Sequence, residues 1–159
     1  MKKIMELLQN MKAKNEKKDN KGFSLVELIV VIAIMAVLVG VLAPQLIKYV
    51  EKSREATDIQ TCDNIATALK TYYADEEVAA SATATATTVT VTLGKTELGT
   101  VADTAVKDAG LTKAKIKGTK WTGDKITIVY NKADGTITYT GDSPYYHSDK
   151  DQFKKGPKS

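Results

Sequence analysis

The 159-residue chain carries 23 Lys and Arg against 19 Asp and Glu, a formal net charge of +4. This length predicts one small domain with an appended segment rather than a multidomain enzyme. The first 22 residues hold seven lysines and three acidic residues, so the remaining 16 basic and 16 acidic residues balance. A neutral remainder without a basic stripe does not support DNA binding.

Cysteine and histidine each occur once. Cys62 alone cannot close an intramolecular disulfide, which excludes a disulfide-rich scaffold. We expect it to be a small apolar residue on a packing face, with intersubunit pairing as the alternative. His147 lies beyond the last expected strand, so the sequence offers no His/Cys cluster for zinc and no Ser-His-Asp set. We therefore expect no catalytic residues, no metal and no cofactor.

An apolar run of membrane length extends from Phe23 to Ala43, with only Ser24 and Glu27 clearly polar. Twenty-one helical residues span about 31 Å, close to the thickness of the bilayer core. Residues 28–43 are apolar all round, whereas a helix of a small soluble domain has one apolar stripe. The run thus predicts a transmembrane helix.

After Pro44 the pattern becomes amphipathic, and apolar residues recur every three or four positions to Tyr73. We expect one helix from Ser24 to about Val78, its second half burying one face. The charged residues of this half are expected to form solvated faces: Lys48, Glu51, Lys52, Arg54, Glu55, Asp58, Asp63 and Lys70.

The rest of the chain predicts a small head. Residues 79–88 are Ala/Thr-rich and read as a linker or loose loop, with a glycosylated tract as the weaker alternative. Residues 89–93 alternate as a strand does, and residues 100–109 can form a short helix that Gly110 ends. Residues 125–131 and 136–140 predict a hairpin, with Trp121 packed beneath it.

Two further segments at the end of the chain need no ligand. Residues 131–135 (NKADG) resemble part of a calcium loop, but such a loop needs several spaced carboxylates and a terminal Glu, so a turn explains them better. Residues 143–159 are charged and aperiodic, and we expect a mobile tail.

The most informative stretch is KGFSLVE, residues 21–27, where the lysine-rich leader meets the apolar run. On one interpretation Ser24 and Glu27 form a capping box that begins the helix of an ordinary signal anchor. On the other, Glu27 has a specific partner, because a carboxylate inside a membrane-spanning segment is costly.

This stretch, continued as KGFSLVELIVVIAI, resembles the leader and helix of type IV prepilins and pseudopilins. The resemblance covers Lys21 to about Pro44. It implies that a prepilin peptidase cuts between Gly22 and Phe23 and that Phe23 is N-methylated. The C-terminal disulfide loop of many pilins has no counterpart here, since only Cys62 is present.

Two residue roles follow from this resemblance. Glu27 of one subunit is expected to pair with the new Phe23 amine of a neighbour in a filament. Pro44 cannot bond the carbonyl of Gly40, so the turn from Gly40 to Pro44 is a candidate helix kink. A simple boundary proline is the equal alternative for Pro44.

The pattern and the resemblance together predict an α+β, type IV pilin-like fold, in which a long N-terminal helix packs on a small antiparallel sheet. The expected parts are a cleaved cytoplasmic leader (1–22), a transmembrane and filament-core helix (23–43), its amphipathic second half (44–78), a head (79–142) and a flexible tail (143–159).

The expected function is a major or minor pilin of a type IV pilus, a helical homopolymer. Its expected partners are a prepilin peptidase, a platform protein, an assembly ATPase and, before assembly, the membrane. Because positive flanks stay cytoplasmic, we expect a single-pass precursor with its N-terminus in the cytoplasm and a mature form in a surface filament. A pseudopilin of a type II secretion or competence system is the alternative. A signal-anchored or secreted binding module, cut after Ala43, is a third candidate.

Overall fold

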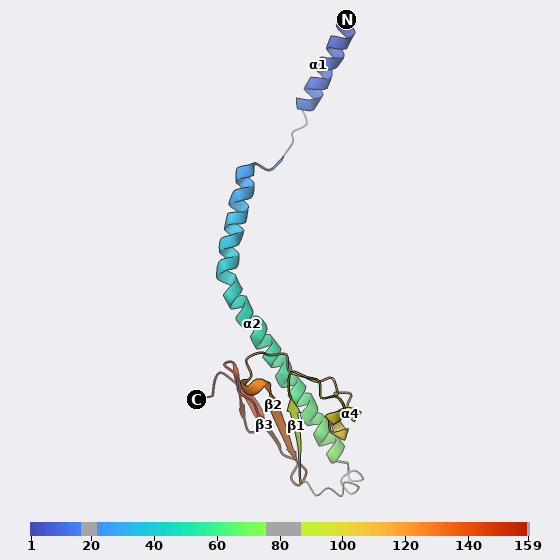
Figure 1. Ribbon diagram of the computed structural model, residues 1–159, viewed down its shortest axis with the longest axis vertical. Helices are drawn as coiled ribbons and strands as arrows, with labels where there is room; N and C mark the ends of the chain where they lie inside the picture. The colour runs from blue at the N-terminus through green and yellow to red at the C-terminus, as the bar shows by residue number, and fades with distance from the viewer. Residues whose placement is uncertain (17–21, 76–86, 159) are drawn as a thin grey trace. The chain divides into compact units, whose positions relative to one another are not determined.

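The computed structural model describes residues 1–16, 22–75 and 87–158. The chain divides into two compact units, Met1–Pro44 and Gln45–Ser159. The first unit contains α1 (Lys2–Glu16) and the apolar part of α2, and the second contains the rest of α2 with the strands (Figure 1).

Helix α2 (Leu25–Tyr73) has 49 residues and contains Pro44. It begins one residue after the predicted Ser24 and ends before the predicted Val78, which lies outside the described residues, as do positions 79–86 of the predicted linker. Among the described residues, α2 is long and apolar enough to cross a membrane, and none of its apolar stretch is buried. This confirms the long N-terminal helix of the predicted fold.

The head sheet is antiparallel with the strand order β1 (Thr88–Leu93), β2 (Ile126–Asn131) and β3 (Ile137–Thr140). Buried and more exposed residues alternate along β2 and β3, as the period of two requires. The predicted strand and hairpin are therefore confirmed, and one sheet face is free to bury apolar side chains.

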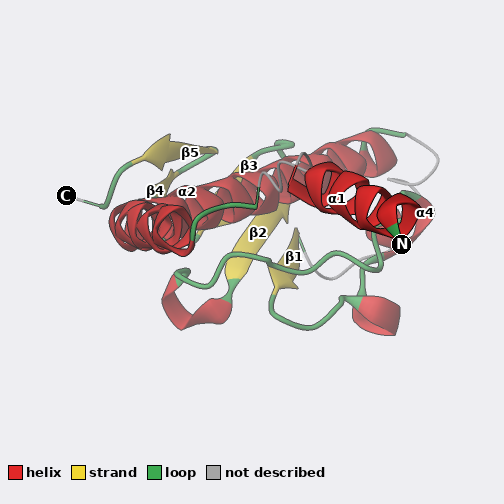
Figure 2. Ribbon diagram, turned by 90° about the horizontal axis from the view of Figure 1, so that it is seen from above, coloured by secondary structure: helices red, strands yellow, loops and turns green. Residues whose placement is uncertain are grey.

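That buried face packs against the second half of α2, beside which the sheet lies in both views (Figures 1 and 2). Cys62, Ile65 and Leu69 are completely buried in one cluster with Ile128 of β2 and with Trp121, as predicted for the tryptophan. Burial, reinforced by nearby carboxylates, raises the pKa of the Cys62 thiol, which disfavours the intersubunit disulfide.

The helix predicted over residues 100–109 is wrong in its extent. The structure has a 3-10 turn, η1 (Gly99–Val101), and a separate short helix, α4 (Thr104–Asp108). Asp103 has extended backbone angles and accepts a hydrogen bond from the backbone N–H of Ala105 at 3.0 Å, so it caps α4 and interrupts the longer helix. Gly110 follows α4 with a φ of 71°, as expected of a residue that ends a helix.

The expected aperiodic tail over residues 143–159 is also wrong. A second, two-stranded antiparallel sheet forms there from β4 (Tyr146–Asp149) and β5 (Gln152–Lys155). Phe153 contacts the rings of Tyr139 and Trp121, with centroids 5.1 and 5.7 Å apart. Strands of four residues carry too little periodicity to be recognised, and this aromatic contact is tertiary.

Candidate processing and assembly site

The junction between leader and helix has an open backbone. Gly22, Phe23 and Ser24 lie outside any helix or strand, immediately before α2. The Phe23 side chain is 85% exposed. A peptide bond in exposed, irregular backbone can enter a protease cleft without unfolding a helix, and Gly22 adds no side chain on the leader side.

Glu27 lies in the first turn of α2. Its Oε2 atom accepts a hydrogen bond from the backbone N–H of Ser24 at 3.1 Å, while the Ser24 carbonyl accepts from Leu28. The glutamate thereby satisfies one backbone donor at the start of the helix, as the glutamate at position N3 of a capping box does. Within one chain, Glu27 is thus bonded to Ser24. Its pairing with the Phe23 amine of a neighbouring subunit stays a prediction.

The apolar segment that follows has no partner among the residues that the structure describes. Its large side chains are between 48% and 73% exposed from Leu25 to Leu42, on every side of the helix. Gly40 faces open space, since a Cβ there would meet nothing within 4 Å. Helix α2 continues through Gly40 and Pro44, and the predicted kink at this turn stays a prediction.

The second half of α2 contains a feature that the sequence interpretation missed. Glu51, Glu55 and Asp58, which we call the acidic stripe, are 6%, 0% and 1% exposed. The expectation of solvated charged faces is therefore wrong at these three positions. Their spacing of four and three residues places them on one helical face, and that face continues into the apolar core at Cys62.

Two members of the acidic stripe bind a loop between β1 and β2. Asp58 accepts hydrogen bonds from the backbone N–H groups of Lys117 and Gly118, both at 2.7 Å. Glu51 accepts from the backbone N–H of Thr119 and forms an ion pair with Arg54 at 3.7 Å. Burial alone would raise the pKa of Glu51, but the hydrogen bonds from Thr119 and the Arg54 charge outweigh it and lower this pKa. The carboxylates thus satisfy backbone donors that no strand satisfies.

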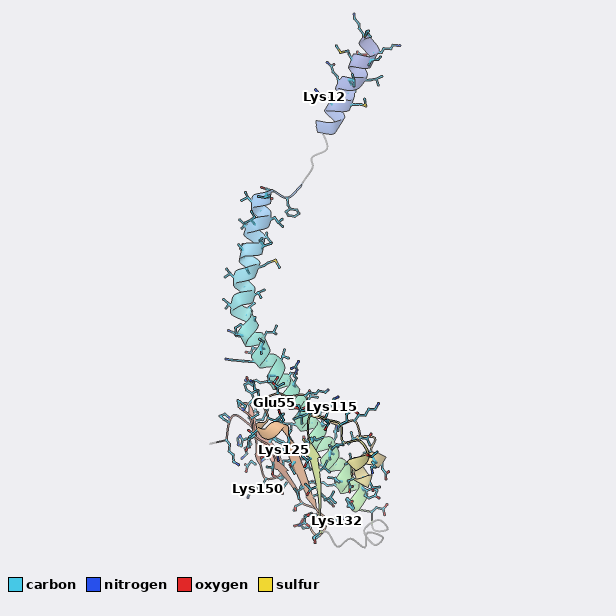
Figure 3. The ribbon with its side chains drawn as sticks, viewed as in Figure 1. Lys12, Glu55, Lys115, Lys125, Lys132 and Lys150 are labelled. Carbon is cyan, nitrogen blue, oxygen red and sulfur yellow. The ribbon has the colours of Figure 1, made fainter. Side chains whose placement is uncertain are left out.

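Glu55, labelled in Figure 3, lies between them in the sequence and binds Ser143 in the loop before β4. Its Oε2 atom accepts a hydrogen bond from the hydroxyl of Ser143 at 2.5 Å. Its Oε1 atom is buried and has no hydrogen-bond partner among the described residues. Burial, together with the charges of Glu51 and Asp58, raises the pKa of Glu55.

A glycine completes this arrangement. A Cβ on Gly118 would lie 2.7 Å from Cγ of Glu55, 2.8 Å from Nε1 of Trp121 and 2.9 Å from Oδ2 of Asp58. Only glycine fits such a contact. The available sequence signal was the i, i+4, i+7 spacing of the carboxylates, but spacing alone does not distinguish a buried acidic face from a solvated one.

Two comparisons with known proteins find similarities, one of them to the N-terminal segment. Residues 17–43 match the family described as the prokaryotic N-terminal methylation motif. A protein of Clostridium perfringens (strain 13 / Type A) named "Prepilin peptidase-dependent protein A" is 41% identical over 70 residues, which are 42% of this chain and 49% of that protein. The match thus spans about half the length of this relative. No solved structure matches the chain.

The motif and the relative support a type IV prepilin- or pseudopilin-like family, and the long apolar helix is consistent with it. The same helix and motif fit a membrane-anchored precursor.

Proposed function

We propose that this chain is the precursor of a structural subunit, a major or minor pilin, that polymerises through its N-terminal helix into a type IV pilus filament. The observation that carries the proposal is the apolar segment of α2, which is exposed on all sides and lies within the matched methylation motif. Apolar surface of this extent needs lipid before assembly and neighbouring helices after it.

Processing is proposed at the junction. A prepilin peptidase cuts between Gly22 and Phe23, and Phe23 is then N-methylated. The exposed, non-helical backbone at these residues supports this role, as does the name of the Clostridium perfringens relative, which refers to prepilin peptidase. Cleavage creates an α-amine on Phe23 whose reference pKa is about 7.7 to 8.0, and methylation leaves it cationic.

Glu27 is proposed as the partner of that amine on a neighbouring subunit. Two unit charges about 4 Å apart gain on the order of 4 kcal/mol at an effective dielectric constant of 20, against several kcal/mol of desolvation for each ion. The pair therefore fixes the register of neighbouring helices more than it stabilises them. In the precursor, the Glu27 carboxylate accepts a hydrogen bond from the backbone N–H of Ser24, which offsets part of its desolvation.

Gly40 and Pro44 are proposed as a joint at the end of the membrane span. Pro44 has no N–H to donate to the carbonyl of Gly40, and glycine is a poor helix former. The open space around Gly40 leaves room for this turn to bend as neighbouring helices pack.

The proposed assembly machinery is a platform protein and a cytoplasmic ATPase, with the mature chain in an extracellular filament that serves adhesion, motility, DNA uptake or secretion. A pseudopilin of a type II secretion or competence system shares the processing junction. Filaments visible on the cell surface distinguish the pilin from it.

The decisive experiment is mass spectrometry of the mature N-terminus, on protein from a host with its native processing machinery. A chain that begins at Phe23 and carries one added methyl group supports processing of the pilin class. A chain that begins at Pro44 indicates an ordinary secreted protein, and a chain that retains residues 1–22 indicates an uncleaved anchor; either result contradicts the proposal.

A further inference from the structure

Helix α1 has an apolar face that no other described part of the chain covers. Ile4, Leu7, Leu8 and Met11 follow one another by three, one and three residues, so they line one side of the helix. Their side chains are between 54% and 61% exposed. Residues 1–22 are therefore more than a hydrophilic leader, because they contain an amphipathic helix.

Lysines border this apolar face. Lys3 precedes Leu7 by four residues and Lys12 follows Leu8 by four, which puts one lysine along each edge of the stripe (Figure 3 labels Lys12). A lysine at such an edge can lay its methylene chain along apolar surface and keep its ammonium group in a polar layer. The opposite side of α1 carries polar residues such as Glu6 and Gln9.

We propose that α1 lies in the plane of the membrane, on the surface of a leaflet rich in anionic lipid, with its apolar stripe among the acyl chains and its lysines among the headgroup phosphates. A charged helix with one apolar face and low overall hydrophobicity is the kind that binds at the interface. Lysines near an anionic leaflet contribute about 1 kcal/mol each. The occupant of the stripe is therefore lipid of negative charge.

The chain also keeps α1 close to that surface. Only nine Cα steps separate Glu16 from Leu25, where the membrane-length helix begins. Even fully extended, they reach about 30 Å. A helix tethered at this range has a high effective concentration at the bilayer surface, so modest affinity is enough.

This inference rests on the proposed membrane span of α2, but not on cleavage or filament formation. Its consequence for the precursor is that Gly22 and Phe23 lie between two membrane-bound helices. The bond to be cut is thereby held at the membrane surface, where a membrane peptidase can reach it.

The test uses the full-length precursor in vesicles made of three parts phosphatidylcholine and one part phosphatidylglycerol. An environment-sensitive fluorophore is attached to a single added cysteine, in either Met11→Cys on the stripe or Gln9→Cys on the opposite side. The native Cys62 does not compete for label, because it is completely buried and its thiol pKa is raised. We expect blue-shifted emission and quenching by lipid-borne quenchers at position 11, with emission typical of water at position 9.

Two further variants carry the probe at position 11. Leu8→Ser removes one apolar group and should lower the ratio of bound to free α1 by about tenfold. Gln9→Ser likewise shortens one side chain to serine, but on the polar side of the helix, and should leave the emission unchanged. Vesicles of phosphatidylcholine alone, or high salt, should shift the emission at position 11 towards that of water.

Equal emission at positions 9 and 11 would overturn the proposal, as would a shift that persists in vesicles of phosphatidylcholine alone. If position 11 stays in water while Leu8→Ser still slows processing in cells, the stripe binds a protein and the lipid proposal fails. If the fluorescence contrast holds but the precursor is never cleaved, the proposed function fails and this inference stands.

Discussion

The indole N–H of Trp121 donates a hydrogen bond to Oδ2 of Asp58 at 2.9 Å, and both side chains are almost completely buried. The two residues are 63 positions apart in the sequence. Because the same oxygen also accepts from the backbone N–H of Gly118, one carboxylate of α2 holds the loop before β2 against the helix.

Asp58→Asn should therefore destabilise the head strongly. An asparagine offers one acceptor oxygen where the aspartate oxygens accept three hydrogen bonds, and its amide N–H groups would face buried donors. Charge-assisted hydrogen bonds contribute about 1.5–3 kcal/mol each, so we expect a loss of about 3 kcal/mol in the free energy of unfolding.

The measurement is urea unfolding of the full chain in detergent micelles, followed by Trp121 fluorescence. Asp63→Asn is the matched control. In the described part of the chain, the Asp63 side chain accepts one hydrogen bond, from the hydroxyl of Tyr139 at 3.0 Å, which an amide oxygen can replace. Equal losses for the two variants would show that the Asp58 contacts do not hold the loop.

Gly118→Ala should cost about 1–3 kcal/mol of unfolding free energy, because the new methyl group overlaps Glu55, Trp121 and Asp58. Gly94→Ala is the control, since a Cβ at Gly94 meets nothing within 4 Å and its φ is not positive. Thermal unfolding of both variants checks this expectation. A Gly118→Ala protein as stable as the Gly94→Ala protein would contradict the close packing described for this loop.

Glu55 should make the stability of the head fall as the pH rises. Its pKa is raised in the folded chain, so the folded state binds more protons than the unfolded state above the ordinary glutamate pKa of 4.5. The favourable contribution is complete below that value and is lost as the pH rises through the higher, folded pKa. Glu55→Gln should flatten this decline.

Glu51 provides the opposite control, because its pKa is lowered by its hydrogen bonds. Its contribution is present above pH 4.5 and is lost as the pH falls through the folded pKa, so Glu51→Gln should reduce the loss of stability in acid. Unfolding free energies at several pH values separate the two effects. A slope above pH 4.5 that is unchanged in Glu55→Gln would show that Glu55 does not titrate as described.

Glu27→Val should leave a chain that inserts, is cleaved and is methylated, yet assembles poorly, because the amine of Phe23 loses its proposed partner. Ser24→Ala is the control, since it keeps the backbone N–H that donates to Glu27. Mass spectrometry of the N-terminus and electron microscopy of cells check processing and assembly separately. Filaments of normal abundance from Glu27→Val would contradict the pairing.

Local patterns were sufficient to predict the long apolar helix, although they did not reveal the amphipathic α1. A helix that is apolar on all sides needs no tertiary partner to be recognised, and the junction at Gly22, Phe23 and Glu27 is a short motif read from consecutive residues. The hairpin of β2 and β3 was predictable for the same reason, since alternation and a turn are contained within a few residues.

Only the tertiary structure decided which charges of α2 are buried. Glu51, Glu55 and Asp58 look like any solvated helical face, and their burial depends on donors from Lys117 to Trp121 and from Ser143, about 60 to 90 residues away along the chain. The final hairpin is ordered by aromatic contacts of Phe153 in the same way. The sequence by itself thus determined where the chain crosses from leader to apolar helix, because that depends on neighbouring residues. Tertiary structure decided how the head packs against the second half of α2, because a buried carboxylate is stable only where distant groups supply its hydrogen bonds.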